Sequence, residues 1–485
     1  MNESLLTLEP AGVWHYFGEI LKIPRPSKHE EQIVAYLEDF ARSRQLSFER
    51  DAVGNVLIRK DASKGYEDRQ TVVLQSHIDM VCEKNSDKVH DFHKDPIEAY
   101  IDNGWVKAKG TTLGADDGIG VAAQLAILAD NNLQHGPVEC LFTIDEETGL
   151  TGAFGLEPGF LKGKILLNLD SEDEGELFIG CAGGKDTVIR LPFSWEHAPE
   201  GFTGLHVEVS GLKGGHSGDD IHKGLGNANK ILNRILWMLN KKSGARLCEI
   251  NGGNLRNAIA REAAAKLLLD PSFATQGIKL AEELSKSIIE EYSITEPGLR
   301  ISIRQSTDQH PWVVNLKDQE QLLNGIYACP HGVIAYSQTI PGFVETSTNL
   351  ASIRMHKDHW EITTSQRSSV ESAKEDVANM VSACFELCGA EITQSNGYPG
   401  WAPNPTSAIR ELTVKSYVKL FGNQPLVKAI HAGLECGLIG DKYPGMDMIS
   451  YGPTIKGAHS PDERLEIASV PKFWELTLEI LKEIP

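Results

Sequence analysis

Histidine and carboxylate side chains recur in this 485-residue sequence at the ends of short apolar runs. The run "VVLQS" is followed by His77 and Asp79, "LFTI" by the acidic residues 145–147, and "ILLNL" by Asp170. Carboxylates gathered in one cleft repel one another and raise one another's pKa unless a cation neutralises them. A metal site is therefore the simplest chemistry for this pattern. Imidazole combined with carboxylate oxygens is typical of zinc or a neighbouring transition metal rather than of magnesium or calcium.

Two further segments carry side chains of the same kinds. Asp116 opens the segment "DDGIGV", and the run "MISYG" is followed by a loop that contains His459. Each motif alone would indicate a hydrogen-bonded surface pair or a solvated loop. Their recurrence in five segments favours metal binding instead. Five ligands suit two ions, because one bridging carboxylate and two terminal ligands per ion use all five and leave a water between ions about 3.5–4 Å apart.

The elements that must position these residues follow an α/β pattern. Short continuous apolar runs are typical of strands buried on both faces. The segments "EEQIVAYLEDFARSR" and "DDGIGVAAQLAILADN" predict helices that pack on a sheet. In an open α/β sheet the carboxyl ends of the strands form one rim where ligands bind, so we expect the candidate ligands at one edge. Ser27 and Glu30 have the spacing of a capping box at the start of the first helix.

The middle of the chain differs from its two ends. Between about 187 and 397 the predicted strands alternate apolar and polar residues, as in "LHVEVSG" and "HWEITTSQRSS", and long helices separate them. This pattern predicts an inserted α+β lid or dimerisation domain at 187–397 with a one-sided sheet. We expect residues 1–186 and 398–485 to form a discontinuous α/β catalytic domain, with helices on both faces of a mixed, mostly parallel sheet.

Composition narrows the classes of function. Asp and Glu number 67 against 47 Lys and Arg, a formal charge of −20, which argues against a nucleic-acid or anionic-membrane partner. The N-terminal segment has acids where a signal peptide would have basic residues, and no apolar stretch reaches the length of a membrane span. We therefore expect a soluble cytoplasmic protein. The eight scattered cysteines predict mostly buried free thiols. We find no nucleophile elbow and no phosphate-binding glycine motif.

Nine motifs along the chain resemble those of one peptidase family. In chain order they are "SHIDMV", "GTTLGADDGIG", "DEETGLTGAFGL", "GCAGG", "GLKGGHSG", "GLGNANK", "NGGNLRNAI", "HAGLECGL" and "GAHSPDE". The family is the dinuclear zinc peptidases that include glutamate carboxypeptidase, bacterial tripeptidase and aminoacylase. The resemblance implies two Zn²⁺ per chain, with Co²⁺ or Mn²⁺ as possible substitutes. It makes His77, Asp116 and Asp170 ligands of one ion, and Asp116, Glu147 and His459 ligands of the other. It also implies a cis peptide bond after Asp116.

The resemblance gives the remaining acids catalytic roles. Asp79 would fix the tautomer of His77. Glu146 would be the general base for a metal-bridged hydroxide and would then protonate the leaving amine. The implied activity is that of a metallopeptidase that hydrolyses dipeptides with a free amino terminus, such as the Xaa-His dipeptide β-Ala-His. A tripeptidase or an N-acyl-amino-acid deacylase would use the same site and is the alternative.

Four residues are candidates for substrate binding. His216 in "GGHSG" resembles the histidine that donates to the oxyanion in this family. Asn257 and Arg367 resemble groups that hold the substrate α-carboxylate, for which the planar fork of arginine is suited, and Arg256 could substitute. Glu435 could receive the free amino group. We also expect a homodimer that acts on small peptides, without a nucleic-acid or membrane partner.

Overall fold

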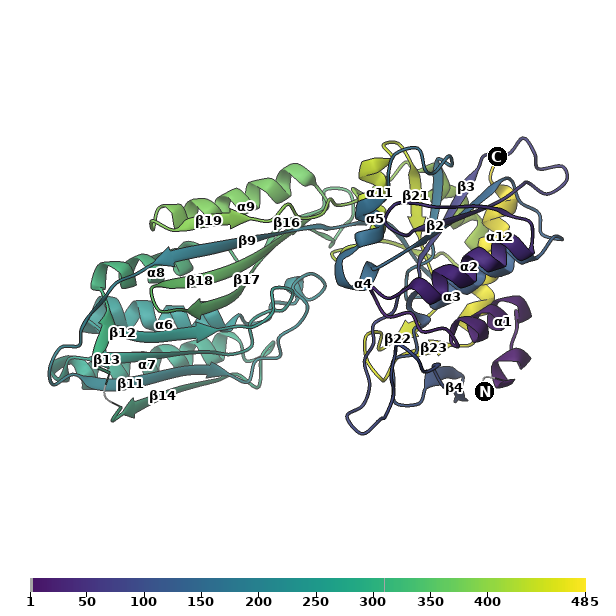
Figure 1. Cartoon of the computed structure of the whole chain (residues 1–485). Coiled ribbons are helices and arrows are strands. Elements are labelled where there is room, and N and C mark those ends of the chain that lie inside the picture. Colours follow the sequence, from purple (N-terminus) through teal and green to yellow (C-terminus); the bar gives the residue numbers. More distant parts are fainter. Residues whose placement is uncertain (1–2, 309) are drawn as a thin grey trace. The chain divides into compact units, whose positions relative to one another are not determined.

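The computed structural model of the chain describes residues 3–308 and 310–485. Contacts within the chain define two compact units, and many of their elements are labelled in Figure 1. Unit 1 comprises Met1–Gly180, Trp401–Ala429 and Leu434–Pro485. Unit 2 comprises Cys181–Gly400 and Ile430–Gly433.

Unit 1 is built on an eight-stranded mixed sheet. In sheet order its strands are β1 (Ser47–Arg50), β2 (Val56–Lys60), β6 (Val138–Thr143), β3 (Val72–His77), β7 (Ile165–Asn168), β21 (Asp447–Ser450), β8 (Glu176–Cys181) and β20 (Leu426–Ile430). The central strands β6, β3, β7 and β21 are parallel, whereas β1 pairs antiparallel with β2, β2 with β6, and β8 with β21. A second sheet contains β22 (Ile455–Lys456), β23 (Arg464–Glu466), β5 (Trp105–Ala108) and β4 (Ala99–Asp102).

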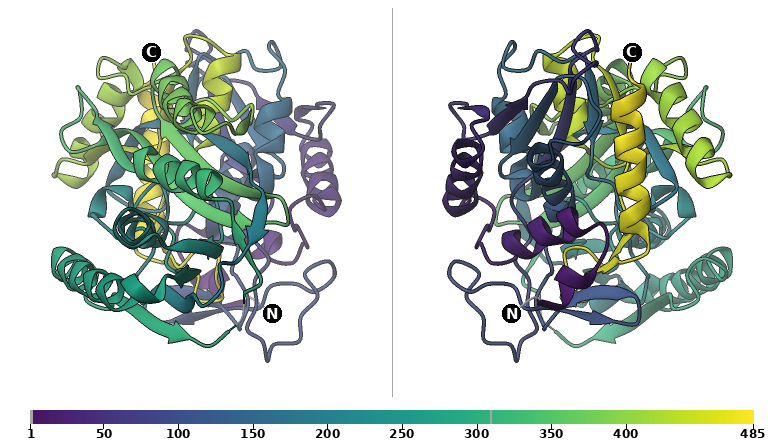
Figure 2. Two further views of the ribbon diagram at one scale, coloured as in Figure 1. Left: turned by 90° about the vertical axis from the view of Figure 1, so that its left-hand side faces the viewer. Right: turned by 90° about the vertical axis from the view of Figure 1, so that its right-hand side faces the viewer.

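Helices surround the large sheet of unit 1 and confirm the α/β class. They are η1 (Glu3–Thr7), α1 (Ala11–Ile20), α2 (Glu31–Ser43), α3 (Ala115–Ala129), α4 (Glu146–Gly149), α5 (Thr151–Gly155), α10 (Ala408–Phe421), α11 (Glu435–Lys442) and α12 (Ser469–Glu483). α3 packs on β3, α2 on β1 and β2, and α10 on β21. The C-terminal helix α12 packs beside α10 and is the long yellow helix in the right-hand view of Figure 2. Every residue of β3 and β6 is buried, as their continuous apolar sequences predict.

The predicted capping box at the start of α2 is wrong. The helix begins at Glu31, and the side chain of Ser27 accepts no hydrogen bond from its first turn. Ser27 Oγ instead donates to Asp79 Oδ2 at 2.7 Å, and Glu30 Oε1 accepts from the backbone N–H of Lys28 at 2.8 Å. The Ser27 hydroxyl, which the local spacing assigns to the end of the helix, therefore donates to the buried carboxylate of Asp79 instead.

Unit 2 contains an antiparallel sheet of nine strands. In sheet order they are β14 (Arg300–Ser306), β11 (Thr203–Ser210), β13 (Ala263–Leu269), β12 (Arg246–Gly252), β17 (Val344–Met355), β18 (His359–Ser368), β9 (Gly183–Pro192) and β19 (Glu391–Gln394), with β16 (Gly332–Tyr336) paired to β17. Its helices are η2 (Ile221–Lys223), α6 (Ala228–Ser243), α7 (Pro271–Glu291), α8 (Leu316–Ala328) and α9 (Glu371–Glu386). Along β11, Leu205, Val207 and Val209 are buried and the residues between them are not, as the alternating sequence predicts.

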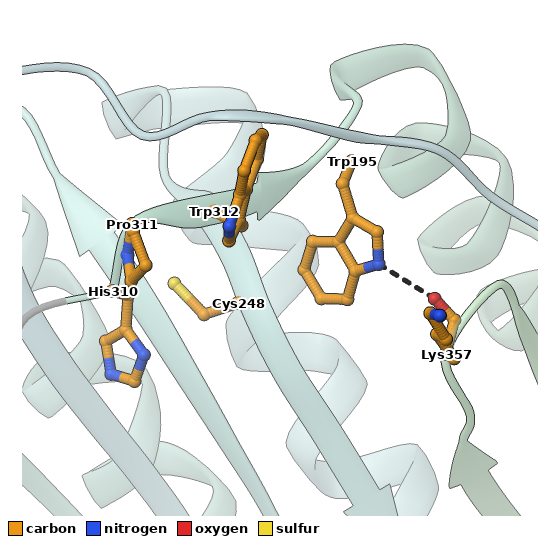
Figure 3. Close-up of a pocket in the computed structure, with 6 residues that line it drawn as sticks. All are labelled: Trp195, Cys248, His310, Pro311, Trp312 and Lys357. Atoms are coloured by element: carbon orange, nitrogen blue, oxygen red, sulfur yellow. Dashed lines mark hydrogen bonds between the residues drawn. The ribbon is translucent and has the colours of Figure 1, made fainter.

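A two-stranded ribbon of unit 2, β10 (Trp195–His197) and β15 (Trp312–Val314), borders a mostly apolar pocket. The pocket has a volume of about 530 Å³. It is lined by Trp195, Cys248, His310, Pro311, Trp312 and Lys357 (Figure 3). Trp195 Nε1 donates to the backbone carbonyl of Lys357 at 2.8 Å. None of the site residues predicted from the sequence lines this pocket.

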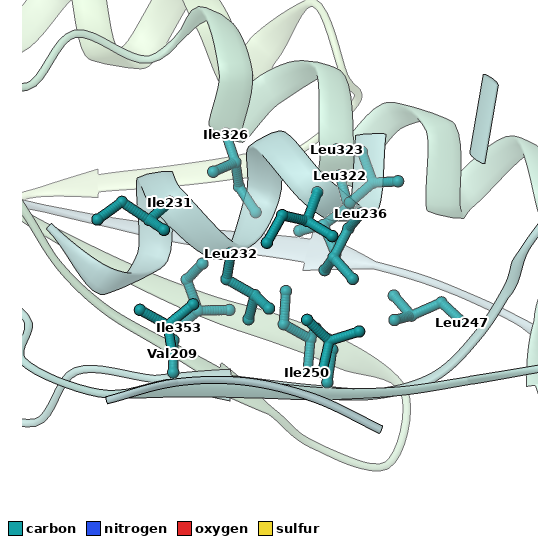
Figure 4. Packing of buried hydrophobic residues seen from close by; sticks show 14 of the residues in the cluster. Val209, Ile231, Leu232, Leu236, Leu247, Ile250, Leu322, Leu323, Ile326 and Ile353 are labelled. Atoms are coloured by element: carbon teal, nitrogen blue, oxygen red, sulfur yellow. The ribbon is translucent and has the colours of Figure 1, made fainter. Parts of the chain in front are cut away.

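The core of unit 2 lies between its sheet and its helices. Figure 4 shows Val209, Leu247, Ile250 and Ile353 from the strands beside Ile231, Leu232 and Leu236 of α6 and Leu322, Leu323 and Ile326 of α8. Local signals fix the ends of α6. The side chain of Asn227 accepts a hydrogen bond from the backbone N–H of Lys230, and Gly244 ends the helix in the left-handed conformation that favours glycine.

Most of the cysteines that the structure describes as free thiols are buried. Cys140, Cys248, Cys329 and Cys388 are buried free thiols, as predicted, and Cys82 and Cys384 are partly exposed. Among the residues that the structure describes, no helix has both the length and the apolar composition needed to cross a membrane.

Candidate metal centre

Parallel strands bring the predicted ligands to one edge of the unit 1 sheet. β3 ends at His77, which lies opposite the last residue of β6. Gln75 of β3 lies opposite Asn168 of β7, so continuing both strands by two residues brings His77 level with Asp170. The chain after β6 enters α4, which begins at Glu146. The sheet geometry expected from the sequence is therefore present.

The five predicted ligands form two groups that share Asp116. His77 Nε2 lies 3.1 Å from Asp116 Oδ1 and 3.4 Å from Asp170 Oδ1. His459 Nε2 lies 3.3 Å from the other oxygen, Asp116 Oδ2, and 3.1 Å from Glu147 Oε2. The ligand atoms of each group lie within 4.8 Å of one another. The peptide bond between Asp116 and the next residue is cis, as the family resemblance implies.

The charges of these side chains fit a divalent cation. Burial raises the pKa of Asp170 to about 7 despite the nearby ring of His77. Hydrogen bonds with Asp116 and Glu147 raise the pKa of His459 to about 11. Glu147 Oε1 is buried with no hydrogen-bond partner among the described residues. Carboxylates held together in this way need a compensating positive charge, and the mixed nitrogen and oxygen donors match zinc or a neighbouring metal.

Asp79 lies behind His77 and also holds the start of α4. Its Oδ1 is 3.3 Å from His77 Nδ1, but the two atoms are not aligned as a hydrogen bond. The same carboxylate accepts hydrogen bonds from the backbone N–H groups of Glu146 at 3.0 Å and Glu147 at 3.2 Å. Burial would raise the pKa of Asp79, but His77 and Ser27 outweigh it and hold that pKa below its usual value. The carboxylate of Asp79 thus contacts both His77, a predicted metal ligand, and the backbone of Glu146, the predicted base.

Glu146 lies next to the predicted ligands without belonging to either shared group. One of its oxygens lies within 4.8 Å of ligand atoms of His77 and Glu147. Burial, together with the negative charges of Asp170 and Glu147, raises the pKa of Glu146 well above its usual value, although His77 opposes the shift. A carboxyl group in this environment can take up and hold a proton beside the ligands.

Two of the predicted substrate-binding residues, His216 and Asn257, lie close together in unit 2. His216 forms an isolated bridge with Ala258, and Asn257 is exposed, with its backbone carbonyl accepting from the N–H of Ser217 at 2.8 Å. His216 Nδ1 accepts a hydrogen bond from the backbone N–H of Asp219 at 3.2 Å. A ring that accepts at Nδ1 carries its proton at Nε2 when neutral, so Nε2 can act as a donor.

Arg367 is a buried guanidinium in unit 2. Its Nη1 donates to the hydroxyl of Tyr398 at 3.2 Å, and its Nε has no hydrogen-bond partner among the described residues. Arg256, the suggested substitute, is exposed and forms an ion pair with Asp186 at 3.1 Å. Burial and the Nε without a partner among the described residues favour Arg367 over Arg256 as an anion-binding group, because a desolvated guanidinium gains most from a carboxylate partner.

Glu435 is enclosed within unit 1. Its Oε2 accepts from Gln75 Nε2 at 2.6 Å and from Thr143 Oγ1 at 2.7 Å, so it joins the side chains of β3 and β6. Its Oε1 has no hydrogen-bond partner in the part of the chain that is described. Burial raises the pKa of Glu435 to about 8. Among the described residues, one oxygen of this carboxyl group is therefore left without a partner.

Two charged residues that support the site were not predicted from the sequence. Arg25 is buried, and its guanidinium donates to the carbonyls of Ile78 at 3.0 Å, Asp79 at 2.8 Å and Gly114 at 2.5 Å. Glu463 is buried and accepts from the backbone N–H groups of residues 113–116. Backbone partners leave no pattern in a sequence. The sequence signals these residues only by their charges: Arg25 lies between two prolines in "IPRPS", and Glu463 ends the motif "GAHSPDE".

Known proteins are similar to this chain over almost all of its length. The sequence profile of peptidase family M20/M25/M40 matches residues 73–483. The chain is 45% identical over 482 residues to the cytosol non-specific dipeptidase of Escherichia coli strain K12, covering 99% of each chain. The crystal structure of aminoacylhistidine dipeptidase from Vibrio alginolyticus is 44% identical, with a TM-score of 0.93, and covers 100% of this chain and 99% of that one. A Staphylococcus aureus tripeptidase shares the fold at 16% identity, with a TM-score of 0.58 over 98% of this chain and 99% of its own.

Proposed function

Because the chain belongs to peptidase family M20/M25/M40, we propose that it is a metal-dependent dipeptidase that hydrolyses dipeptides with a free amino terminus, Xaa-His dipeptides among them. The observation that carries this proposal is the position of Asp116, whose two oxygens face His77 and His459 respectively. Two relatives above 40% identity are both named as dipeptidases, which supports the substrate class.

The donor set supports two cations per chain. His77, Asp116 and Asp170 would hold one, and Asp116, Glu147 and His459 would hold the other. Zinc suits imidazole mixed with carboxylate, and Co²⁺ or Mn²⁺ could replace it. When bound, such cations would polarise the scissile carbonyl and lower the pKa of the attacking water.

Side chains of unit 1 would move the protons. Glu146 would take a proton from the attacking water while the oxygen of that water bonds to the carbonyl carbon. Glu146 would then give the proton to the amine nitrogen as the C–N bond breaks. The raised pKa of Glu146, caused by burial, supports its holding the proton between these steps. Asp79 would keep Glu146 in place through the N–H group at the start of α4.

Four other residues would bind the substrate. The Nε2–H group of His216 would donate a hydrogen bond to the oxyanion, which the acceptor role of its Nδ1 supports. Arg367 and Asn257 would bind the α-carboxylate, which is supported by the Nε of Arg367, unpaired in the part of the chain that is described. Oε1 of Glu435 has no partner among the described residues, which supports a role in binding the substrate amino group.

We also propose that the enzyme is cytoplasmic and homodimeric. The name of the Escherichia coli relative supports the location. The size of unit 2, Cys181–Gly400 with Ile430–Gly433, supports self-association because it exceeds a typical domain of about 100–150 residues.

The test is hydrolysis of a substrate panel by metal-free and reconstituted protein. The panel contains β-Ala-His and other dipeptides, tripeptides and N-acetyl amino acids. We expect dipeptide hydrolysis that a chelator abolishes and that Zn²⁺, Co²⁺ or Mn²⁺ restores. Full activity in metal-free protein would contradict the metal mechanism. Faster cleavage of tripeptides or N-acetyl amino acids than of dipeptides would contradict the proposed substrate class.

A further inference from the structure

Glu463 is a buried carboxylate that accepts hydrogen bonds from four consecutive backbone amides. Oε2 accepts from Leu113 at 2.7 Å and Gly114 at 2.9 Å, and Oε1 accepts from Ala115 at 2.7 Å and Asp116 at 3.3 Å. Charge-assisted hydrogen bonds of this kind are among the stronger ones in proteins. Four of them on one side chain fix the segment that ends in the shared residue Asp116.

Glu463 itself belongs to the loop that carries His459. The Glu463 N–H donates to the carbonyl of Ser460 at 3.0 Å, and Ser460 Oγ donates to the carbonyl of Gly457 at 2.7 Å. His459 itself has a φ of +62°, a left-handed backbone that costs energy in a residue with a side chain. Such a conformation persists when its surroundings hold it. The turn from Gly457 to Glu463 provides that support.

Arg25 holds the same segment from its carbonyl side. Its Nη2 donates to the carbonyl of Gly114, while Nη1 reaches the carbonyls of Ile78 and Asp79. Burial lowers the pKa of Arg25, and the charges of Asp79 and Glu463 oppose that shift. The segment 113–116 is therefore held through its N–H groups by Glu463 and through a carbonyl by Arg25.

We propose that Glu463 is a positioning residue that fixes Asp116 and His459 relative to each other. It thereby sets the cation affinity of the position formed by Asp116, Glu147 and His459. This inference rests on the proposed metal centre. Asp116 carries the last of the four amides that Glu463 binds, and His459 lies on the turn that ends in Glu463. The distance of 3.3 Å between His459 Nε2 and Asp116 Oδ2 is thus maintained through one carboxylate.

The test is the variant Glu463→Gln, which keeps the shape of the side chain. Its amide oxygen can accept from part of the segment, but its NH₂ group faces backbone N–H groups that also need an acceptor. We measure binding of Zn²⁺ to metal-free protein by calorimetry and the visible absorption of the Co²⁺ form. We expect an affinity about 10–100-fold weaker at one of two positions, the usual effect of losing a supporting group, with an altered Co²⁺ band. kcat should fall more than KM rises.

The control is Asp462→Asn, which makes the same change of charge at the neighbouring exposed residue. It should bind both ions as the wild type does. Wild-type affinities and Co²⁺ band in Glu463→Gln would overturn the inference while leaving the metal centre intact. A wild-type protein that binds no metal would instead refute the metal centre. If Glu463→Gln does not fold, the test uses Glu463→Asp, because its shorter carboxylate cannot reach all four amides. Unchanged metal binding in Glu463→Asp would also overturn the inference.

Discussion

The carboxylate of Asp79 accepts a hydrogen bond from the backbone N–H of Glu146 at 3.0 Å while its other contacts include His77 Nδ1 at 3.3 Å. The group behind the predicted metal ligand therefore also holds the predicted base. Loss of its charge should affect both functions, and two measurements can separate them. Metal affinity reports on the orientation of His77, and kcat at saturating metal reports on the position of Glu146.

For Asp79→Asn we expect a metal affinity about 10–100-fold weaker and a further fall in kcat after metal is restored. The Asn side chain has one acceptor oxygen where Asp79 has two, so one of the two N–H groups at the start of α4, those of Glu146 and Glu147, loses its partner. Ser27→Ala is the matched control, because it removes one hydrogen bond to the same carboxylate and leaves the charge. An effect of Ser27→Ala as large as that of Asp79→Asn would contradict the importance of the charge.

The adjacent acids Glu146 and Glu147 should have separable roles. Glu146→Ala should retain metal and lose several orders of magnitude in kcat, since the proton acceptor is gone. Glu147→Ala should lose occupancy of one ion, because Glu147 Oε2 lies with His459 and Asp116. Metal content by elemental analysis and kcat on a dipeptide give the two readouts. Two variants that both hold two ions and turn over normally would contradict both assignments.

Stability should fall in mild acid because of His431, a buried residue of unit 2. Burial, with the nearby charge of Arg367, lowers the pKa of His431 to about 3. The folded pKa lies below the unfolded value of about 6.5, so the unfolded chain binds the extra proton and stability is lost as the pH falls from about 6.5 towards 3. Between pH 7 and 5 this one group should cost about 2 kcal/mol of unfolding free energy.

The check on His431 is urea unfolding at both pH values. His431→Asn should lose about 2 kcal/mol less than the wild type between pH 7 and 5, because it cannot take up the proton. His222→Asn, at an exposed histidine of the same unit, should lose as much as the wild type. Equal losses in all three proteins would show that His431 does not titrate in this way.

The sequence predicts those parts of the fold that depend on local patterns. The apolar runs that become β3, β6 and β7 are continuous because nearly all of their residues are buried on both faces, and β11 alternates because one face packs on helices. Since parallel strands end at one edge, the five ligand-type residues can be grouped from the order of strands along the chain. Their separate metal-binding roles remain predictions.

What the sequence did not reveal depends on contacts between distant segments. Ser27 matches a helix cap locally, yet it bonds to Asp79 more than 50 positions away along the chain. Arg25 and Glu463 bind backbone groups, which every residue carries, so no residue type marks their partners. The segment from about 271 to 344 has no motif, and its strand β14 is placed by pairing with β11 at the sheet edge.

His216 should contribute to turnover without contributing to metal binding. Its Nδ1 accepts from the backbone of Asp219, so its Nε2 proton is available to a developing oxyanion. Loss of one oxyanion donor typically costs about 10²–10³-fold in kcat. We therefore expect His216→Ala to lower kcat by that factor with unchanged metal content, and His222→Ala to behave as the wild type. Full activity of His216→Ala would exclude a catalytic part for this histidine.

A mixture of His216→Ala and Glu146→Ala protein tests which chain supplies the donor. Each variant alone lacks one group, so a mixed dimer could contain one complete set only if the histidine of one protomer serves the metal centre of its partner. Recovery of activity on mixing would then show donation across the dimer. Continued inactivity in a mixture shown to exchange subunits would assign His216 to the metal centre of its own chain.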